Sequence, residues 1–287
     1  MSQTPNRKKF NYSEHTGEYV EIQGLRVHVT AGGSGDPLLL IHGIGQSSYT
    51  WRRNFDLLCE HFFVVAVDMI GYGYSDRPSL TYTIEENSEF LLALLNVLRI
   101  RKTHIVAMGS GACYALDLMI HYPDRVDRAV CIAPGGITEQ MPLTLRTMAS
   151  GVGRAMNVLF SERTVRRLLH SCMFDQTCLT SKDIAEVYKT LDSREAKEVL
   201  IRSVQSFDES EVVSRLRMMP HEVLYLWGLE DRWRPVTECS EVYLAATQNG
   251  TLCTMRNCGH MPHEEKPERF CSIVHDFLLT GSVSSES

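Results

Sequence analysis

The sequence lacks paired cysteines, an excess of positive charge and any long hydrophobic run. Its nine cysteines are an odd number without paired spacing, which excludes a disulfide framework and favours a reducing, cytoplasmic setting. The 29 lysines and arginines are outnumbered by 35 acids, and the net charge of −6 argues against binding to nucleic acid. The longest apolar run, residues 90–98, is far shorter than the roughly 20 residues of a membrane span. The first twenty residues also lack a signal-peptide pattern.

What the chain does contain is a regular alternation of strand and helix patterns in its first half. Residues 18–33 read as an opening pair of strands, followed by nearly continuous apolar strands at 37–43, 62–68, 103–109 and 127–135. Helical patterns lie between these strands, at residues 51–62, 84–98 and 110–121. The alternation predicts an α/β fold with a mostly parallel sheet of about eight strands and helices on both faces.

The alternation stops in the middle of the chain. Residues 136–219 hold several helical patterns and no convincing strand, whereas strand patterns resume at 221–228 and 250–256. We therefore predict a core domain formed by residues 1–135 and 220–287, with an all-helical lid inserted at 136–219. A last amphipathic helix is expected at 267–279.

Two glycine-rich turns follow predicted strands. In LLLIHGIG, residues 38–45, a strand runs into His42 and Gly43, where the backbone can approach a ligand closely. We expect this turn to contribute to substrate binding and the Ile44 N–H to stabilise an oxyanion; the alternative is an ordinary glycine turn. In DMIGYGYSDRP, Asp68 is expected to fix its own loop rather than to act in catalysis.

An acid and a histidine follow the last two predicted strands. Asp231 lies just after the strand at 221–228, and His260 lies on the loop between the last strand and the last helix. A lone aspartate or histidine in such a loop is usually structural. Both follow strand ends, however, and sites in open parallel sheets lie at the carboxyl ends of the strands. The pattern therefore favours a functional acid and base.

Together these motifs resemble the α/β-hydrolase superfamily, particularly its lidded members. The resemblance covers nearly all of residues 19–279, with HGIG as the oxyanion turn and residues 68–78 as a typical loop of the family. It implies that Asp231 is the acid of the catalytic triad and His260 the base, in the chain order nucleophile, acid, histidine.

The position of the nucleophile departs from the family pattern. In AMGSG, residues 107–111, the centre of the small-x-nucleophile-x-small elbow is Gly109. Moving the register by one residue would make Ser110 the nucleophile, but it would put the bulky Met108 where close packing requires a small residue. We therefore place Gly109 at the nucleophile position and expect the Ser110 N–H to complete the oxyanion hole.

Three functions stay open. The first is an enzyme without a covalent step, in which His260, oriented by Asp231, is a general base for lyase, cyclase, decarboxylase or direct hydrolytic chemistry on a small apolar carbonyl compound. The second is a serine hydrolase, an esterase or C–C bond hydrolase, in which Gly109 replaces the native serine. The third is a non-catalytic ligand-binding protein. We expect no cofactor, no metal and no nucleic-acid or membrane partner, and the sequence leaves a homodimer open. Cys113, inside a helix, is expected to be inert.

Overall fold

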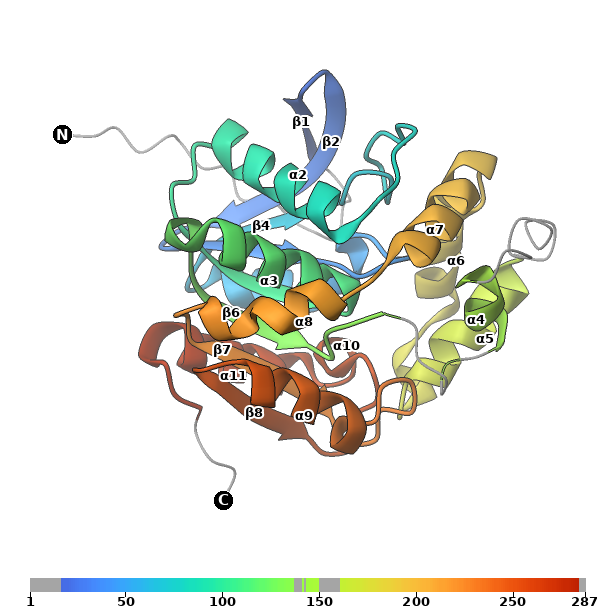
Figure 1. Ribbon diagram of the computed structural model, residues 1–287. Helices are drawn as coiled ribbons and strands as arrows, with labels where there is room; N and C mark the ends of the chain where they lie inside the picture. Colours follow the sequence, from blue (N-terminus) through green and yellow to red (C-terminus); the bar gives the residue numbers. More distant parts are fainter. Residues whose placement is uncertain (1–16, 137–140, 142, 150–160, 284–287) are drawn as a thin grey trace.

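The computed structural model describes residues 17–136, 141, 143–149 and 161–283, and their centre is one eight-stranded sheet (Figure 1). The strand order is β1-β2-β4-β3-β5-β6-β7-β8. Strand β2 pairs antiparallel with β1 and β4, and all other neighbours are parallel. The strands are β1 Glu18–Ile22, β2 Leu25–Gly33, β3 Pro37–Ile41, β4 Phe63–Val67, β5 Thr103–Met108, β6 Val126–Ile132, β7 Val223–Gly228 and β8 Gly250–Met255. The predicted mostly parallel sheet is confirmed.

The central strands are buried on both faces, as their apolar sequences predict. Every residue of β5 and β7 is buried, and the register places Leu40 of β3 between Ala66 of β4 and Val106 of β5. Helices supply this cover. Helices α2, α3, α8 and α9 follow one another on one face (Figure 1). Helix α1 packs against α11.

The helix bounds follow local sequence signals. Thr83 and Glu86 form a capping box at the start of α2, and α11 ends at Gly281, which has a φ of 74°. The core helices are α1 Phe55–Cys59, α2 Ile84–Val97, α3 Ser110–His121, α8 Ser210–Arg215, α9 Val236–Ala246, α10 Pro262–Glu265 and α11 Pro267–Thr280, with 3-10 turns η2 Ser48–Trp51, η3 Pro123–Arg125 and η6 Leu216–Met218. The helix expected at 51–62 is confirmed only in part, because Ser47 caps the separate turn η2 and α1 covers only Phe55–Cys59.

The described residues between 136 and 219 form helices and loops without a strand. Four helices lie to one side of the sheet (Figure 1). They are α4 Leu143–Ala149, α5 Glu162–Cys172, α6 Ser181–Leu191 and α7 Arg194–Ser206, with the 3-10 turn η5 Gln176–Cys178. Helix α8, although within the range predicted as lid, packs against α3 and α9 of the core. Residues of these four helices line one pocket together with residues that follow β3, β5 and β8, so the helices lie over the carboxyl ends of the strands. We refer to these four helices as the lid; with α8 the chain has returned to the core.

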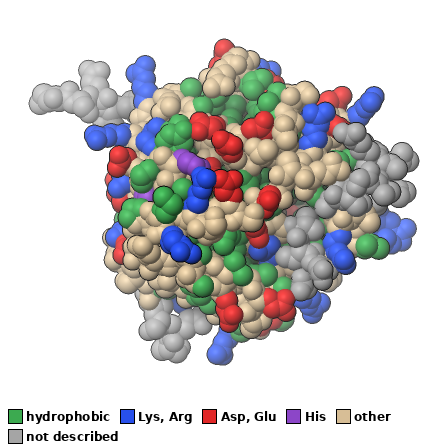
Figure 2. Space-filling model, in the orientation of Figure 1, with side chains coloured by type: hydrophobic (Ala, Val, Ile, Leu, Met, Phe, Trp, Pro, Cys, Tyr) green, Lys and Arg blue, Asp and Glu red, His purple; other side chains and the backbone are tan. Residues whose placement is uncertain are grey.

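The surface carries both signs of charge. Basic and acidic side chains are intermixed on the face shown in Figure 2. Across the part of the chain that the structure describes, no helix combines the length and apolar character needed to cross a membrane.

Candidate active site

The sheet brings the predicted site residues to one edge. The turn after β3 carries His42, Gly43 and Ile44, and Gly109 lies between β5 and α3. Asp231 and His260 follow β7 and β8. Because β3, β5, β6, β7 and β8 are parallel and adjacent in the sheet, their carboxyl ends meet under the lid, as expected for a site in an open α/β sheet.

Gly109 occupies the sharp turn between β5 and α3. Its φ of 54° and ψ of −125° lie in a region that a side chain with a Cβ rarely adopts. Backbone hydrogen bonds hold the turn, since the Gly109 N–H donates to the Ile132 carbonyl at 2.9 Å and the Gly109 carbonyl accepts from Gly135 at 3.1 Å. A Cβ built on Gly109 finds the Gly135 carbonyl, at 4.0 Å, as its nearest described neighbour. The turn therefore has a backbone conformation that favours glycine, with open space where a side chain would be.

Asp231 and His260 form a buried pair. The Nδ1 atom of His260 lies 2.8 Å from Oδ2 of Asp231, and the two residues are 7% and 4% exposed. The other carboxylate oxygen of Asp231 accepts hydrogen bonds from the N–H groups of Trp233 at 2.8 Å and Arg234 at 3.0 Å. With Nδ1–H donated to Asp231, His260 directs the lone pair of Nε2 away from the carboxylate. Such an arrangement is suited to orienting a general base.

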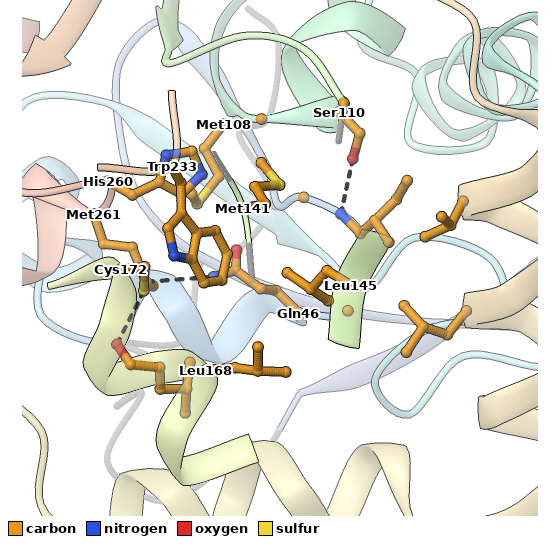
Figure 3. Close-up of a pocket in the computed structure, with 18 of the residues that line it drawn as sticks. Gln46, Met108, Ser110, Met141, Leu145, Leu168, Cys172, Trp233, His260 and Met261 are labelled. Atoms are coloured by element: carbon orange, nitrogen blue, oxygen red, sulfur yellow. Dashed lines mark hydrogen bonds between the residues drawn. The ribbon is translucent and has the colours of Figure 1, made fainter. Parts of the chain in front are cut away.

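The backbone of His260 is tied to the lid. Its N–H donates to the carbonyl of Cys172, the last residue of α5, at 2.7 Å. The indole of Trp233 lies beside the imidazole, with ring centroids 5.5 Å apart (Figure 3). The Trp233 indole N–H in turn donates to Ser171 of α5 at 3.2 Å. The imidazole is therefore held by the core through Asp231 and by the lid through α5.

The side chain of His42 is used within its own turn. Its Nδ1 lies 2.8 Å from the Gly43 carbonyl, and its Nε2 accepts the Met69 N–H at 3.0 Å. Burial lowers the pKa of His42, and the nearby Asp68 offsets part of this effect. A neutral imidazole that bridges two loops positions the turn, whereas Gly43 itself lines the pocket and His42 does not.

Ile44 and Ser110 meet at the expected oxyanion position, but through a contact that the sequence did not predict. The Ile44 N–H donates to the Ser110 hydroxyl oxygen at 2.8 Å (Figure 3). The Ser110 N–H belongs to the first residue of α3, where helix N–H groups have no partner within the helix. The two expected donors are thus adjacent, and one of them is engaged by a side chain of the chain itself.

An apolar pocket lies between these residues and the lid. The described residues enclose about 130 Å³, close to the roughly 150 Å³ of a cavity that holds a single benzene ring. Besides the predicted residues, the pocket is lined by further side chains, among them Gln46, Met108, Met141, Leu145, Leu168, Cys172, Trp233 and Met261 (Figure 3). Of these, the sequence reasoning missed Gln46, Leu145, Leu168, Cys172, Trp233 and Met261 as lining residues, although Trp233 lies only two residues after Asp231.

Two other sequence expectations concern residues outside this pocket. Cys113 is fully buried, and burial raises the pKa of its thiol well above the usual value, which agrees with the inert role expected for it. Asp68 is fully buried and accepts the N–H groups of Ser48 at 2.7 Å and Tyr74 at 2.8 Å. It also lies 2.9 Å from Nδ1 of His28, so it fixes its loop as predicted.

Comparisons with known proteins agree with this architecture. Residues 36–267 match the model of the alpha/beta hydrolase fold family. The chain is 29% identical over 290 residues to a 2-hydroxymuconate semialdehyde hydrolase of Pseudomonas sp. (strain CF600), covering 96% of this chain and 98% of that protein. It is 30% identical over 282 residues to a protein of the same name from Pseudomonas putida, covering 94% of this chain and 97% of the relative.

Solved structures show the same fold. A meta-cleavage product hydrolase from Pseudomonas fluorescens IP01 superposes with a TM-score of 0.80 at 24% identity, covering 93% of this chain and 98% of that chain. The family match spans most of the sequence, including both glycine turns and the Asp231–His260 pair. The chain belongs to the α/β-hydrolase fold family and is an α/β-hydrolase-like enzyme.

Proposed function

We propose that the protein performs general-base chemistry on a small apolar carbonyl compound without a covalent enzyme intermediate. One observation carries the proposal: the His260–Asp231 contact of 2.8 Å is retained at a pocket where the elbow residue, Gly109, has no side chain. The base and its orienting acid have little use in a hydrolase fold unless a proton is moved. A bound water or the substrate itself then takes the place of the missing hydroxyl.

Direct hydrolysis is the reaction that the curated relatives favour, since the two described above are named semialdehyde hydrolases. In the proposed step, His260 takes a proton from water while the water oxygen bonds to the substrate carbonyl carbon. The carbonyl oxygen becomes an oxyanion that accepts hydrogen bonds from the N–H groups of Ile44 and Ser110. Collapse of this adduct restores the carbonyl and breaks the bond to the leaving carbon or oxygen, which receives the proton from His260. Asp231 stabilises the imidazolium in between.

The same residues serve the non-hydrolytic alternatives. If His260 removes a proton next to a substrate carbonyl, the electron pair moves onto the carbonyl oxygen as an enolate, and the same two N–H groups stabilise it. Loss of a β-leaving group or ring closure then follows without water. For a substrate with a carboxylate β to the carbonyl, loss of CO₂ leaves its electron pair as the enolate, and the imidazolium of His260, protonated from solvent, gives its proton to the enolate carbon. The pocket volume of about 130 Å³ accommodates a reacting part of about one ring.

The test uses 2-hydroxymuconate semialdehyde first and then a panel of small keto acids. We expect His260→Ala to lower turnover by on the order of 10²–10⁴, the usual contribution of a positioned base. Asp231→Asn should lower it to a similar extent, because the imidazole loses its orientation. His121→Ala, at a 41% exposed surface histidine, is the matched control and should change nothing. Undiminished turnover in His260→Ala would contradict the mechanism.

A serine hydrolase with glycine in place of its nucleophile is the second candidate. The open space around a Cβ at position 109 favours it, because an added Cβ has no described neighbour closer than 4.0 Å. On this hypothesis Gly109→Ser gains strong activity on 4-nitrophenyl acetate and is labelled by a fluorophosphonate probe, whereas the unaltered chain has neither property. If Gly109→Ser stays inert in both assays, this candidate is rejected. A ligand that binds equally well after loss of His260 and is never turned over would instead indicate a binding protein.

A further inference from the structure

The Ser110 hydroxyl accepts the hydrogen bond of the Ile44 N–H, which the proposed reaction needs for the oxyanion. Its oxygen accepts the Ile44 N–H at 2.8 Å, which lies within the normal range for such a bond (Figure 3). Both residues line the pocket, and Ser110 is only 4% exposed. Because an N–H group carries a single proton, a ligand oxygen cannot take the hydrogen bond of Ile44 while the Ser110 oxygen holds it. The hydroxyl must first turn away.

A second partner for the hydroxyl lies one helical turn further along α3. Tyr114 follows Ser110 by four residues, so the two side chains share one face of the helix. Tyr114 is 1% exposed, and its hydroxyl has no hydrogen-bond partner among the described residues. Burial raises the pKa of Tyr114, and the Ser110 side chain lowers it in part. An unpaired buried hydroxyl costs about 1–3 kcal/mol, so pairing with Ser110 is favourable.

We propose that the Ser110 hydroxyl is a two-position plug of the oxyanion hole. In the closed position it accepts the Ile44 N–H, and in the open position it turns to the Tyr114 hydroxyl and frees the amide for a ligand oxygen. The functional role of this plug rests on the proposed function, in which Ile44 is an oxyanion donor. The plug itself is a property of the ligand-free chain and can be tested separately.

The plug determines which ligands the site accepts. A ligand that needs the open position binds with an affinity reduced by the fraction of molecules in which the hole is open. Hydrogen bonds to an ionised oxygen are roughly twice as strong as those between neutral groups. A carboxylate or an enolate oxygen therefore displaces the neutral hydroxyl more readily than an ester or ketone carbonyl does. The chemical class we assign to the hole is an anionic oxygen on a small apolar body.

Hydrogen exchange tests the plug without any ligand. In the unaltered protein the Ile44 amide should exchange slowly, and in Ser110→Ala it should exchange on the order of ten times faster, because its acceptor is gone. Tyr114→Phe should slow this exchange or leave it unchanged, since the open position loses its partner. The Gln46 amide, which donates to the Gly43 carbonyl at 3.2 Å, is the control inside the same turn. An Ile44 amide that exchanges equally in Ser110→Ala, or a Gln46 amide that changes in parallel, overturns the plug.

Ligand binding tests its function. We expect calorimetric titration with benzoate to give tighter binding in Ser110→Ala and weaker binding in Tyr114→Phe, each by roughly 2- to 10-fold for one hydrogen bond. The double variant Ser110→Ala, Tyr114→Phe should bind benzoate as tightly as Ser110→Ala, because Tyr114 acts only through its hydrogen bond to the Ser110 hydroxyl. Weaker binding in Ser110→Ala would show that the hydroxyl donates to the ligand, and would overturn the proposal. If benzoate binds none of the four proteins, the oxyanion role of Ile44 fails, while hydrogen exchange still decides whether the plug exists.

Discussion

Replacement of Gly109 by alanine tests the geometry of the elbow directly. At a φ of 54° and a ψ of −125°, a residue with a Cβ is strained, by about 1–3 kcal/mol for such sparsely populated conformations. The added methyl group finds its nearest described neighbour at 4.0 Å, so overlap adds nothing to this cost. Alanine also restricts the unfolded chain, which returns about 0.4–1 kcal/mol. We therefore expect a net loss of about 1–2 kcal/mol in the free energy of unfolding.

Two other glycines provide matched controls. Gly24 has a φ of 81° and no described atom within 4 Å of an added Cβ, so Gly24→Ala should cost about the same as Gly109→Ala. Gly111 has ordinary helical geometry, but its Cβ would lie 2.3 Å from the His42 carbonyl oxygen. Such an overlap with backbone forces the turn after β3 to move, at the upper end of the about 1–3 kcal/mol of overpacking or beyond. Gly111→Ala should therefore be the most destabilising of the three.

Urea unfolding followed by circular dichroism gives these three free energies. A thermal scan should show a decrease in Tm of about 2–4 °C per kcal/mol lost. The result that refutes the reasoning is a Gly109→Ala variant as stable as the unaltered protein, because the elbow would then lack its positive φ. A loss above that of Gly111→Ala would equally refute it, because the space around position 109 would then be filled.

Two further predictions concern stability. Burial lowers the pKa of His42 and lowers that of His263 well below its usual value. Near pH 6.5 these histidines are therefore protonated in the unfolded chain but stay neutral in the folded chain. Stability should thus be full above about pH 6.5 and fall toward pH 5, as measured by urea midpoints, with a shallower fall in His263→Gln. Arg52 bonds two buried carboxylates, Asp183 at 2.8 Å and Glu264 at 2.6 Å, and Arg52→Met should cost about 3–5 kcal/mol. A cost below about 1 kcal/mol would show that water screens these contacts.

The fold could be predicted from sequence because its strands are unambiguous. The run VLYLWG of β7 is buried at every position, and nothing but a central parallel strand accounts for it. Where propensity and tertiary context compete, the prediction was confirmed only in part. Residues 51–62 have a helical pattern, yet Ser47 caps a 3-10 turn and only Phe55–Cys59 is α-helical. Helix α8 continues the helical run of the lid, and only its contacts with α3 and α9 place it in the core.

The site could be predicted only as far as backbone positions determine it. Gly109, Asp231 and His260 follow strand ends, so strand order alone brings them together. The side-chain contacts required coordinates. Nothing in the sequence indicates that the Ser110 hydroxyl turns to the Ile44 amide, because the choice of a serine rotamer depends on a residue 66 positions away. The lining by Cys172 and Trp233 likewise depends on how α5 packs on the loop of His260.

The backbone conformation of the elbow does not depend on a nucleophilic side chain at position 109. A serine at position 109 would add a strained side chain, whereas glycine adopts the same φ at little cost. The remaining parts are independent of that side chain, because backbone hydrogen bonds hold the elbow and Asp231 holds His260. On the proposed function, the absence of a side chain at position 109 therefore leaves the Asp231–His260 pair in place, and the Ile44 amide becomes available once the Ser110 hydroxyl turns away. In a serine hydrolase that loss costs on the order of 10⁶ in rate, and on the order of 10³–10⁴ over water remains. A native reaction much faster than this remaining rate needs another nucleophile or an acidic proton, which the substrate or water must supply. Taking that proton, or activating that water, is the role that we propose for His260.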